Sequence, residues 1–336
     1  MRIIIDAFGG DNAPLEIIKG AAMGVAEYGV DVTLVGRENE IKRVMSENGI
    51  SDERITIANA DDVFSMDTDP ALALKTGKES SIIKGLYMLA NDEGDAYISA
   101  GSTGALVLGS SLVVKRIKGI RRAALATLVP STSGNYLLLD AGATVDVSPE
   151  VLDQFALMGS VYMEKVENRP QPRVGLVNIG TEENKGTDLH RETYKLMKQT
   201  DKYKFVGNVE GRDLPTGGCD VAVTDGFTGN IVLKVSEGMG IMAKSYLKEL
   251  FGKNAITKGS ALIVRKGLRG ISTAMDYSSV GGAPFMGIRK PVIKAHGSSK
   301  AKAICSAMRQ AMAYTENNVI GIIEENIAKR EEENRE

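Results

Sequence analysis

Cysteine and histidine are scarce in this sequence of 336 residues, which contains two of each. Cys219 and Cys305 stand alone and far apart, so the sequence offers neither a disulfide framework nor a cysteine zinc site. The two histidines, His190 and His296, belong to no H-E-x-x-H pair. We therefore expect no metal ion and a reducing, cytoplasmic environment.

Long hydrophobic runs and an excess of charge are also missing. The opening apolar stretch Ile3–Ile5 is too short for a signal peptide, and no later run reaches the length of a membrane span. A net charge of -2 and a pI near 5.9 argue against a general nucleic-acid binder, so any basic surface must be local. With 43% hydrophobic and 25% charged residues, the chain is long enough for one large α/β unit or two lobes.

Three familiar loop motifs are absent from the sequence. There is no G-x-x-x-x-G-K-[ST] phosphate loop, no G-x-G-x-x-G dinucleotide fingerprint and no G-x-S-x-G nucleophile elbow. A dehydrogenase or a serine hydrolase therefore has no positive support. The pattern favours phosphate, or a phosphate group, as a reactant in place of a protein nucleophile.

What the opening section does contain is an alternation of strands and helices, typical of parallel α/β folds. The pattern predicts strands at Ile3–Ile5, Val32–Val35 and Ile55–Ala58, with helices at Leu15–Tyr28 and Glu38–Asn48. We expect residues 1–330 to form one catalytic α/β unit of two lobes.

A small-residue turn after the β-forming residues Ala96–Ser99 is the first candidate binding element. Glycine lets the backbone of such a turn approach a ligand, and a helix start carries free N–H groups that attract anions. Ser102, Thr103 and Gly104 are therefore predicted to bind phosphate. The alternative is a strand–helix turn that binds nothing.

The middle of the chain repeats this arrangement. Asp140 follows a predicted strand and precedes a glycine, as Asp6 does near the N-terminus. A helix is predicted at Pro149–Val166, and the proline-containing stretch 167–173 is the candidate hinge between lobes.

The next two turns carry further candidates. Lys185 lies in a loop beside the helix cap Thr187, where an ammonium can pair with an anion held at the helix start. Thr228 and Asn230 precede a helix predicted at Ile231–Leu250, where their side chains can cap the helix or hold a ligand. His190 is expected to have no special role.

The last turn precedes the C-terminal helix, predicted at Ala301–Ile323. His296, Ser298 and Ser299 form a polar Gly/Ser turn there. For His296 the alternative is an imidazole that satisfies backbone groups. The charged tail 324–336 is expected to be solvated.

A basic and apolar segment at residues 252–271 is the second functional signal. No acidic residue occurs between Glu249 and Asp276. Its candidate contact residues are Lys258, Leu262, Ile263, Arg265 and Lys266. This composition suits an anionic membrane, an acidic protein partner or a dimer partner.

Taken together and in order, these motifs resemble those of the bacterial acyl-[acyl-carrier-protein]:phosphate acyltransferases of phospholipid synthesis. The matching motifs are Asp6-Ala-Phe-Gly-Gly-Asp11 with Pro14, Ser99-Ala-Gly-Ser-Thr-Gly-Ala105, Asn178-Ile-Gly-Thr-Glu182 with Lys185-Gly186, Gly207-Asn-Val-Glu210, Thr224-Asp-Gly-Phe-Thr-Gly-Asn230 and Lys294-Ala-His-Gly-Ser-Ser299. The match spans nearly the whole chain. Phe8 replaces the usual methionine and Ser102 the usual asparagine, so at position 102 either a hydroxyl or the backbone must do the work of an amide.

The resemblance implies transfer of a long acyl chain from acyl carrier protein to inorganic phosphate without an organic cofactor. It implies a three-layer α/β/α sandwich similar to isocitrate/isopropylmalate dehydrogenases, with two lobes around a cleft, in a homodimer. It also implies reversible contact with an anionic membrane and with a membrane-bound glycerol-3-phosphate acyltransferase. Lys185 and Asn230 are expected nearest the chemistry, with His296 beside the phosphate. A phosphate acetyl- or butyryltransferase using acyl-coenzyme A and a non-catalytic membrane scaffold are the alternatives.

Overall fold

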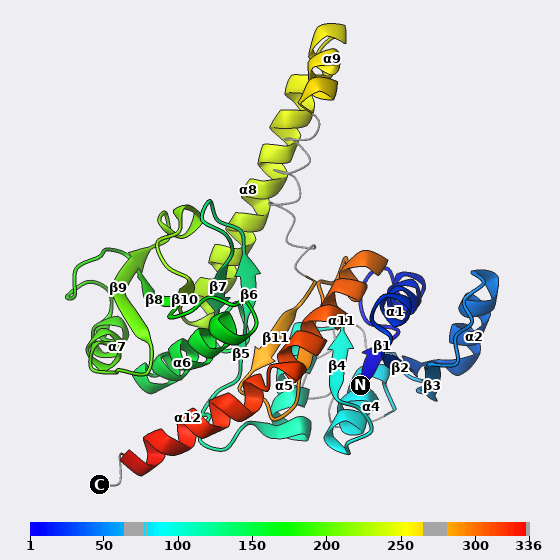
Figure 1. The fold of residues 1–336 in the computed structure, drawn as a ribbon, viewed down its shortest axis with the longest axis horizontal. Helices are drawn as coiled ribbons and strands as arrows, with labels where there is room; N and C mark the ends of the chain where they lie inside the picture. Colours follow the sequence, from blue (N-terminus) through cyan, green and yellow to red (C-terminus); the bar gives the residue numbers. More distant parts are fainter. Residues whose placement is uncertain (64–76, 78, 265–280, 334–336) are drawn as a thin grey trace.

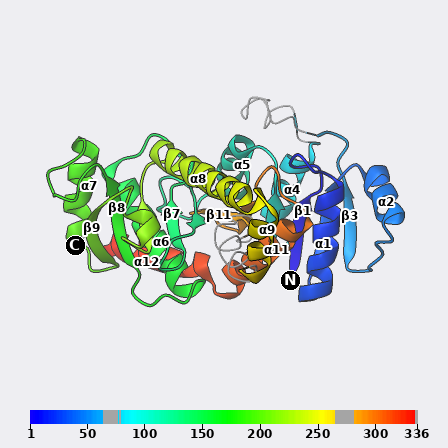
Figure 2. The same ribbon diagram turned by 90° about the horizontal axis from the view of Figure 1, so that it is seen from above.

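The computed structural model describes residues 1–63, 77, 79–264 and 281–333, and its strands form two sheets in two neighbouring lobes (Figure 1, Figure 2). The first lobe has a seven-stranded sheet in the order β3-β2-β1-β4-β12-β11-β5. Its strands are β1 (Arg2–Asp6), β2 (Asp31–Gly36), β3 (Ile55–Asn59), β4 (Ala96–Ser99), β5 (Ala124–Leu125), β11 (Ala283–Met286) and β12 (Val292–Lys294). All pairs from β3 to β12 are parallel, whereas β11 runs antiparallel to both of its neighbours.

Helices cover both faces of the first sheet. Alternate side chains of β1 point to opposite faces, so Ile3 and Ile5 share one core cluster with α1 (Leu15–Tyr28) and α11 (Ala301–Glu316). Ile4 shares another with α4 (Ser81–Ala90), α5 (Thr103–Gly109) and the π-helical turn η1 (Ser110–Lys115). Helix α2 (Glu38–Glu47) connects β2 and β3. The predicted opening alternation of strands and helices is confirmed.

The second lobe has a five-stranded sheet in the order β6-β7-β10-β8-β9. Its strands are β6 (Thr127–Val129), β7 (Tyr136–Leu139), β8 (Arg173–Asn178), β9 (Lys204–Glu210) and β10 (Val221–Val223). Leu137 and Leu139 belong to the core cluster that holds α6 (Pro149–Lys165) and α7 (Asp188–Lys198), whereas Leu138 belongs to the cluster shared with the first lobe. A short 3₁₀ turn, η2 (Leu214–Thr216), precedes β10. The result is the predicted α/β/α sandwich in two lobes.

The chain passes between the two sheets at positions that differ from the expected hinge. Ala126 separates β5 of the first sheet from β6 of the second, and its N–H donates to Pro284 O at 3.0 Å. The stretch 167–173 instead connects α6 to β8, which both belong to the second lobe. The proline signal there marks a loop within a lobe.

Helix α8 (Gly226–Gly252) projects from the body of the molecule and carries α9 (Ala255–Ile263) at its end (Figure 1). The helix begins five residues before the predicted Ile231, because the Asp225 carboxylate accepts the Thr228 N–H at 2.9 Å and caps it. On α9, Lys258 is exposed and Ile263 is 85% exposed. The side chain of Leu262, and Arg265 and Lys266 as a whole, lie outside the described residues.

The C-terminal region contains two helices where one was predicted. Helix α11 ends at Glu316, Asn318 adopts a left-handed φ of 49°, and α12 (Val319–Glu333) follows. The expectation of a solvated tail from residue 324 agrees with the exposed side chains of Glu324, Glu325 and Lys329, but one side of the segment packs on the protein. Ile327 is buried, and Arg330 forms an ion pair with the buried Asp153 of α6.

Candidate active site

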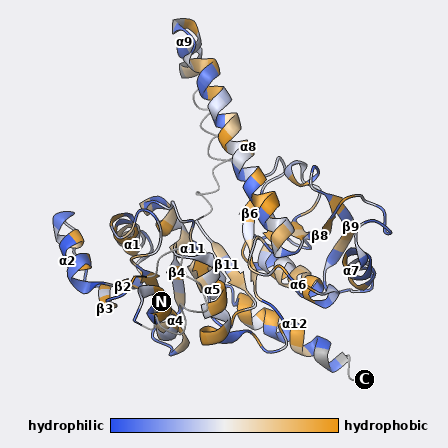
Figure 3. Cartoon of the chain, turned by 180° about the vertical axis from the view of Figure 1, so that it is seen from behind, coloured by the Kyte–Doolittle hydropathy of each residue, from blue (hydrophilic) through white to orange (hydrophobic). Residues whose placement is uncertain are grey.

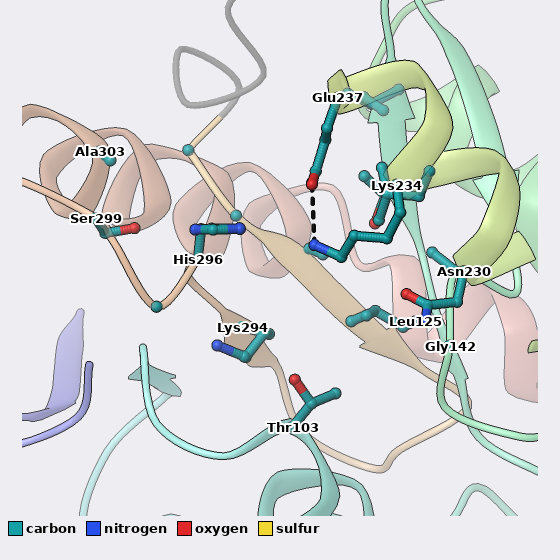
Figure 4. Close-up of a pocket in the computed structure, with 18 of the residues that line it drawn as sticks. Thr103, Leu125, Gly142, Asn230, Lys234, Glu237, Lys294, His296, Ser299 and Ala303 are labelled. Carbon is teal, nitrogen blue, oxygen red and sulfur yellow. Dashed lines mark hydrogen bonds and ion pairs between the residues drawn. The ribbon is translucent and has the colours of Figure 1, made fainter. Parts of the chain in front are cut away.

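A cavity of about 390 Å³ lies between the lobes, where β4 and β12 of the first sheet and β7 of the second end (Figure 4). This is the edge at which parallel α/β sheets usually bind ligands. Its lining includes Thr103, Leu125, Leu128, Gly142, Asn230, Leu233, Lys234, Glu237, Lys294, His296 and Ser299. Leucines line one part of the wall and polar side chains another, so the cavity suits a ligand with both an apolar and an anionic part.

Lys294 is the basic residue at the end of β12. Its Nζ donates to two backbone oxygens, Ala100 O at 3.2 Å and Ala295 O at 2.5 Å. Burial lowers the Lys294 pKa to about 8, although the negative charges of Asp6 and Asp11 oppose this shift. Within the described residues Lys294 forms no ion pair, so its positive charge is available to an anion in the cavity.

A second lysine in the cavity wall has a carboxylate partner. Lys234 Nζ lies 2.9 Å from Glu237 Oε2, one turn along α8 (Figure 4). This pair leaves little net charge on that side of the cavity. The contrast identifies Lys294 as the stronger attraction for an anionic ligand.

His296 lies above Lys294 on the same polar side (Figure 4). Its Nδ1 is 3.2 Å from the Ser298 N and 2.9 Å from Ser298 Oγ. Because an amide N–H can only donate, Nδ1 is the acceptor, and a neutral ring must carry its proton on Nε2. Burial lowers the His296 pKa, while the carboxylate of Glu237 opposes the shift. The neutral ring is therefore favoured near pH 7, with Nε2–H as a hydrogen-bond donor.

Asn230 lies opposite this polar side, on the second turn of α8 and against Gly142. A Cβ at position 142 would lie 3.5 Å from the Asn230 Oδ1, and Gly142 has a φ of 133° that other residues rarely adopt. The Asp140 carboxylate holds this turn by accepting the N–H groups of Gly142 at 3.0 Å and Thr144 at 2.6 Å. Burial nevertheless raises the Asp140 pKa to about 6.

The Asp6 carboxylate holds a turn in the first lobe, as the Asp140 carboxylate does in the second. Its carboxylate accepts Ser99 Oγ–H at 2.7 Å and the Phe8 N–H at 3.1 Å, and Ser99 Oγ in turn accepts the Gly101 N–H at 3.0 Å. Burial raises the Asp6 pKa. The repeated strand, acid and glycine pattern in the sequence thus corresponds to two carboxylates that each hold a turn of the cavity wall.

Four of the predicted site residues line the cavity: Thr103, Asn230, His296 and Ser299. Ser102 caps α5 through the Ala105 N–H at 3.5 Å and lines a separate hollow of about 210 Å³ beside Asp6. Gly104 is exposed. Ser298 supports the His296 ring, as described above.

Three predicted residues lie away from the cavity wall or are engaged elsewhere. Thr228 Oγ1 donates to the Asp225 carboxylate at 2.7 Å. Thr187 is the N-cap residue of α7, but its hydroxyl lies 2.8 Å from His190 Nδ1 and does not cap the helix. Lys185 Nζ lies 3.9 Å from Glu182 Oε1 in the same loop.

The cavity also contains residues that have no local signal in the sequence. Lys294 stands at the start of one of the matching motifs, yet nothing in the strand pattern indicated that its Nζ turns toward Ala100. Lys234 and Glu237 fall within a long apolar helix and gave no separate signal. Over the described part of the chain, no group of three or more metal-ligating side chains occurs, and no helix is long and apolar enough to cross a membrane.

Comparison with known sequences gives close relatives over nearly the full length. The family described as "Fatty acid synthesis protein" matches residues 1–321. A phosphate acyltransferase of Thermoanaerobacter pseudethanolicus is 44% identical over 328 residues, covering 97% of each chain. Another, from Geobacillus sp., is 46% identical over 329 residues and covers 97% of this chain and 98% of the relative.

Comparison with solved structures gives the same type of fold at low sequence identity. A phosphotransacetylase from Streptococcus pyogenes has a TM-score of 0.65 at 16% identity, covering 96% of this chain and 94% of the other. A 4-hydroxythreonine-4-phosphate dehydrogenase from Klebsiella pneumoniae has a TM-score of 0.52 at 13% identity, covering 93% and 98%. At these identities the likeness concerns the fold alone.

Proposed function

Because the chain belongs to the fatty acid synthesis protein family and is a phosphate acyltransferase by that membership, we propose that its donor is a long-chain acyl-[acyl-carrier-protein]. The acceptor is inorganic phosphate, and the product is an acyl phosphate for phospholipid synthesis. The observation that carries the proposal is the two-sided cavity. Lys294 offers a positive charge at one side, and Leu125, Leu128 and Leu233 offer an apolar wall at the other.

The proposed phosphate subsite is the polar side of the cavity. Lys294 supplies charge, His296 supplies its Nε2–H, and the hydroxyls of Thr103 and Ser299 supply further donors. A phosphate dianion already carries a nucleophilic oxygen near neutral pH. It needs capture and orientation more than it needs a base.

In the proposed reaction, one phosphate oxygen attacks the thioester carbonyl carbon. A C–O bond forms, negative charge builds on the carbonyl oxygen, and the C–S bond then breaks to release the thiolate of the carrier, which takes up a proton. The Asn230 side-chain amide, on the second turn of α8, supports the oxyanion. Lys185 is proposed to approach the cavity from its rim, since its loop leads into α7.

Exposed side chains on α8 and on α9 support two further parts of the proposal, a homodimer and a membrane contact. Apolar side chains at intervals of three or four residues are exposed along α8, as the orange positions of Figure 3 illustrate. They are Phe227, Ile231, Val235, Met239, Met242, Tyr246 and Leu250. An exposed apolar stripe of this length favours coverage by a second copy in a homodimer.

The end of the projection is the proposed membrane contact. Ile256 is 80% exposed and Ile263 is 85% exposed, and Lys258 lies between them. Apolar side chains flanked by lysine suit reversible contact with an anionic bilayer. Such contact would keep a cytoplasmic enzyme close to a membrane-bound glycerol-3-phosphate acyltransferase that uses the product.

The proposal is tested by incubating the protein with long-chain acyl-[acyl-carrier-protein] and radiolabelled phosphate. We expect a labelled acyl phosphate that hydroxylamine destroys. Transfer from acetyl- or butyryl-coenzyme A without transfer from the carrier donor would instead establish the short-chain alternative.

A further inference from the structure

Seven basic residues lie on two segments, 115–122 and 289–290, which meet at one edge of the first lobe. They are Lys115, Arg116, Lys118, Arg121, Arg122, Arg289 and Lys290, and together they define the basic surface. The chain brings two distant segments together here, since Arg116 and Ile288 form a β-bridge. In a protein with a net charge of -2, this is a local concentration of positive charge.

Most of this charge has no ion-pair partner in the described part of the chain. Arg121 pairs with Glu150 at 2.9 Å, and Lys290 pairs with Asp92. The other five basic side chains make no ion pair with any residue that the structure describes. Like charges held close together repel one another. Binding of an acidic partner would therefore reduce the electrostatic repulsion among these basic side chains.

The basic surface is held in shape by backbone contacts. The Ile117 N–H donates to Gly287 O at 2.9 Å, and the Arg289 N–H donates to Lys115 O at 3.0 Å. The guanidinium of Arg116 donates to Arg121 O at 2.6 Å. Ile117 and Ile120 are buried beneath the loop. A surface already ordered in this way loses little conformational entropy when it binds.

An apolar centre accompanies the charges. A hollow of about 640 Å³ is lined by four basic side chains and one acidic one, together with apolar residues such as Tyr87 and Val113. The charged residues are Lys115, Lys118, Arg289, Lys290 and Glu324. Tyr87 is 41% exposed, and Leu112 nearby is 62% exposed. Apolar side chains surrounded by charged ones are the usual arrangement of a protein docking site.

We propose that the basic surface docks the acidic acyl carrier protein, an inference that rests on the donor proposed above. The surface lies close to the site, because Arg122 precedes Leu125 of the cavity wall by three residues, roughly 10 Å along an extended chain. An anionic membrane fits this position poorly. In Figure 1 the teal segment that follows α5 lies at the opposite end of the molecule from α9.

The test uses the full-length protein with Lys118→Glu and Arg122→Glu combined. Both side chains are exposed and form no ion pair with the residues that the structure describes, so the variant should unfold at the same temperature as the wild type. We expect its KM for the acyl-carrier donor to rise roughly tenfold or more, because charge reversal repels an acidic partner. The KM for phosphate should not change. Fluorescence anisotropy with labelled, acyl-free carrier protein should show the same loss of affinity.

The matched control combines Lys195→Glu and Lys204→Glu, two exposed lysines on the second lobe, and should behave as the wild type. Equal donor KM and equal carrier affinity in the Lys118/Arg122 variant and the wild type would overturn the docking proposal alone. Loss of sedimentation with anionic vesicles but unchanged carrier kinetics would overturn it in favour of a membrane contact. If the wild type makes no acyl phosphate from the carrier donor, the proposed function itself fails.

Discussion

Arg330, near the end of the described chain, forms an ion pair with Asp153, a carboxylate on α6 that has no solvent exposure. Tyr203 donates a hydrogen bond to the same carboxylate. The pair connects α12 to the second lobe, while α11 before it packs on the first. A segment that reads as a charged tail therefore fastens the two lobes together.

Replacing Arg330 should destabilise the protein. Arg330→Ala leaves the buried Asp153 charge without its cation, and removing one member of a buried pair costs about 3–5 kcal/mol. Because the Arg330 side chain is 26% exposed, we expect a smaller loss of about 2–3 kcal/mol. Urea denaturation would measure it. Lys329→Ala, at an exposed neighbour, is the control, and equal midpoints for the two variants would show that the pair contributes nothing.

The sequence predicted the elements with strong periodicity and misplaced those that depend on a few polar contacts. The alternating section from β1 to β3 was correct because buried strands and capped helices have clear patterns. The start of α8 was misplaced because Gly226–Asn230 has low helix propensity. The Asp225 cap and the close packing of Gly229 on Asp140 override that propensity, since a Cβ at Gly229 would lie 1.8 Å from Asp140 O.

The sequence predicted only part of the candidate site, because some of its residues have a local sequence signal and others do not. Turn residues such as Thr103, Asn230 and His296 carry a local signal, because each stands beside a glycine at the start of a helix. Lys294 carries none, since a lysine at the end of a strand usually points into solvent. Its place in the cavity depends on β12 pairing with β4, almost two hundred residues earlier in the chain.

Lys294 should control the affinity for phosphate. Lys294→Ala removes a partly buried charge, and loss of such a contact costs about 2–4 kcal/mol, or roughly a hundredfold in kcat/KM for phosphate. Lys234→Ala should have a smaller effect, because Glu237 already compensates that charge. Steady-state kinetics with varied phosphate would compare the two. Similar losses in both variants would show that Lys294 has no special part in binding.

The pH dependence gives an independent test of Lys294. Burial lowers its pKa to about 8, so the protonated form is lost as the pH rises through that value. The KM for phosphate should therefore rise above pH 8 in the wild type, although phosphate itself keeps its negative charge. In Lys294→Arg the guanidinium stays protonated, and any activity that remains should lose this dependence. The same rise in both proteins would assign the titration to another group.

Lys185 is the residue whose proposed role depends most on loop position. Lys185→Ala should lower kcat roughly a hundredfold, because a charged contact to the reacting groups is lost. The unfolding temperature should not change, because the 3.9 Å contact of the exposed Lys185 ammonium with Glu182 is weak. Lys204→Ala, an exposed lysine on β9, serves as the control. A folded Lys185→Ala protein with unchanged turnover would remove this lysine from the proposed mechanism.

Ile263 tests whether α9 contacts a membrane. Its side chain is 85% exposed, and a carboxylate there should oppose entry into an anionic bilayer, whereas lysines such as Lys258 each add about 1 kcal/mol of attraction. We expect Ile263→Glu to stop sedimenting with anionic vesicles while it keeps its acyl phosphate activity in solution. Val206→Glu, on β9 of the second lobe, should still sediment. If Ile263→Glu instead becomes monomeric in light scattering, α9 belongs to the subunit interface, and the loss of vesicle binding follows from the loss of the dimer.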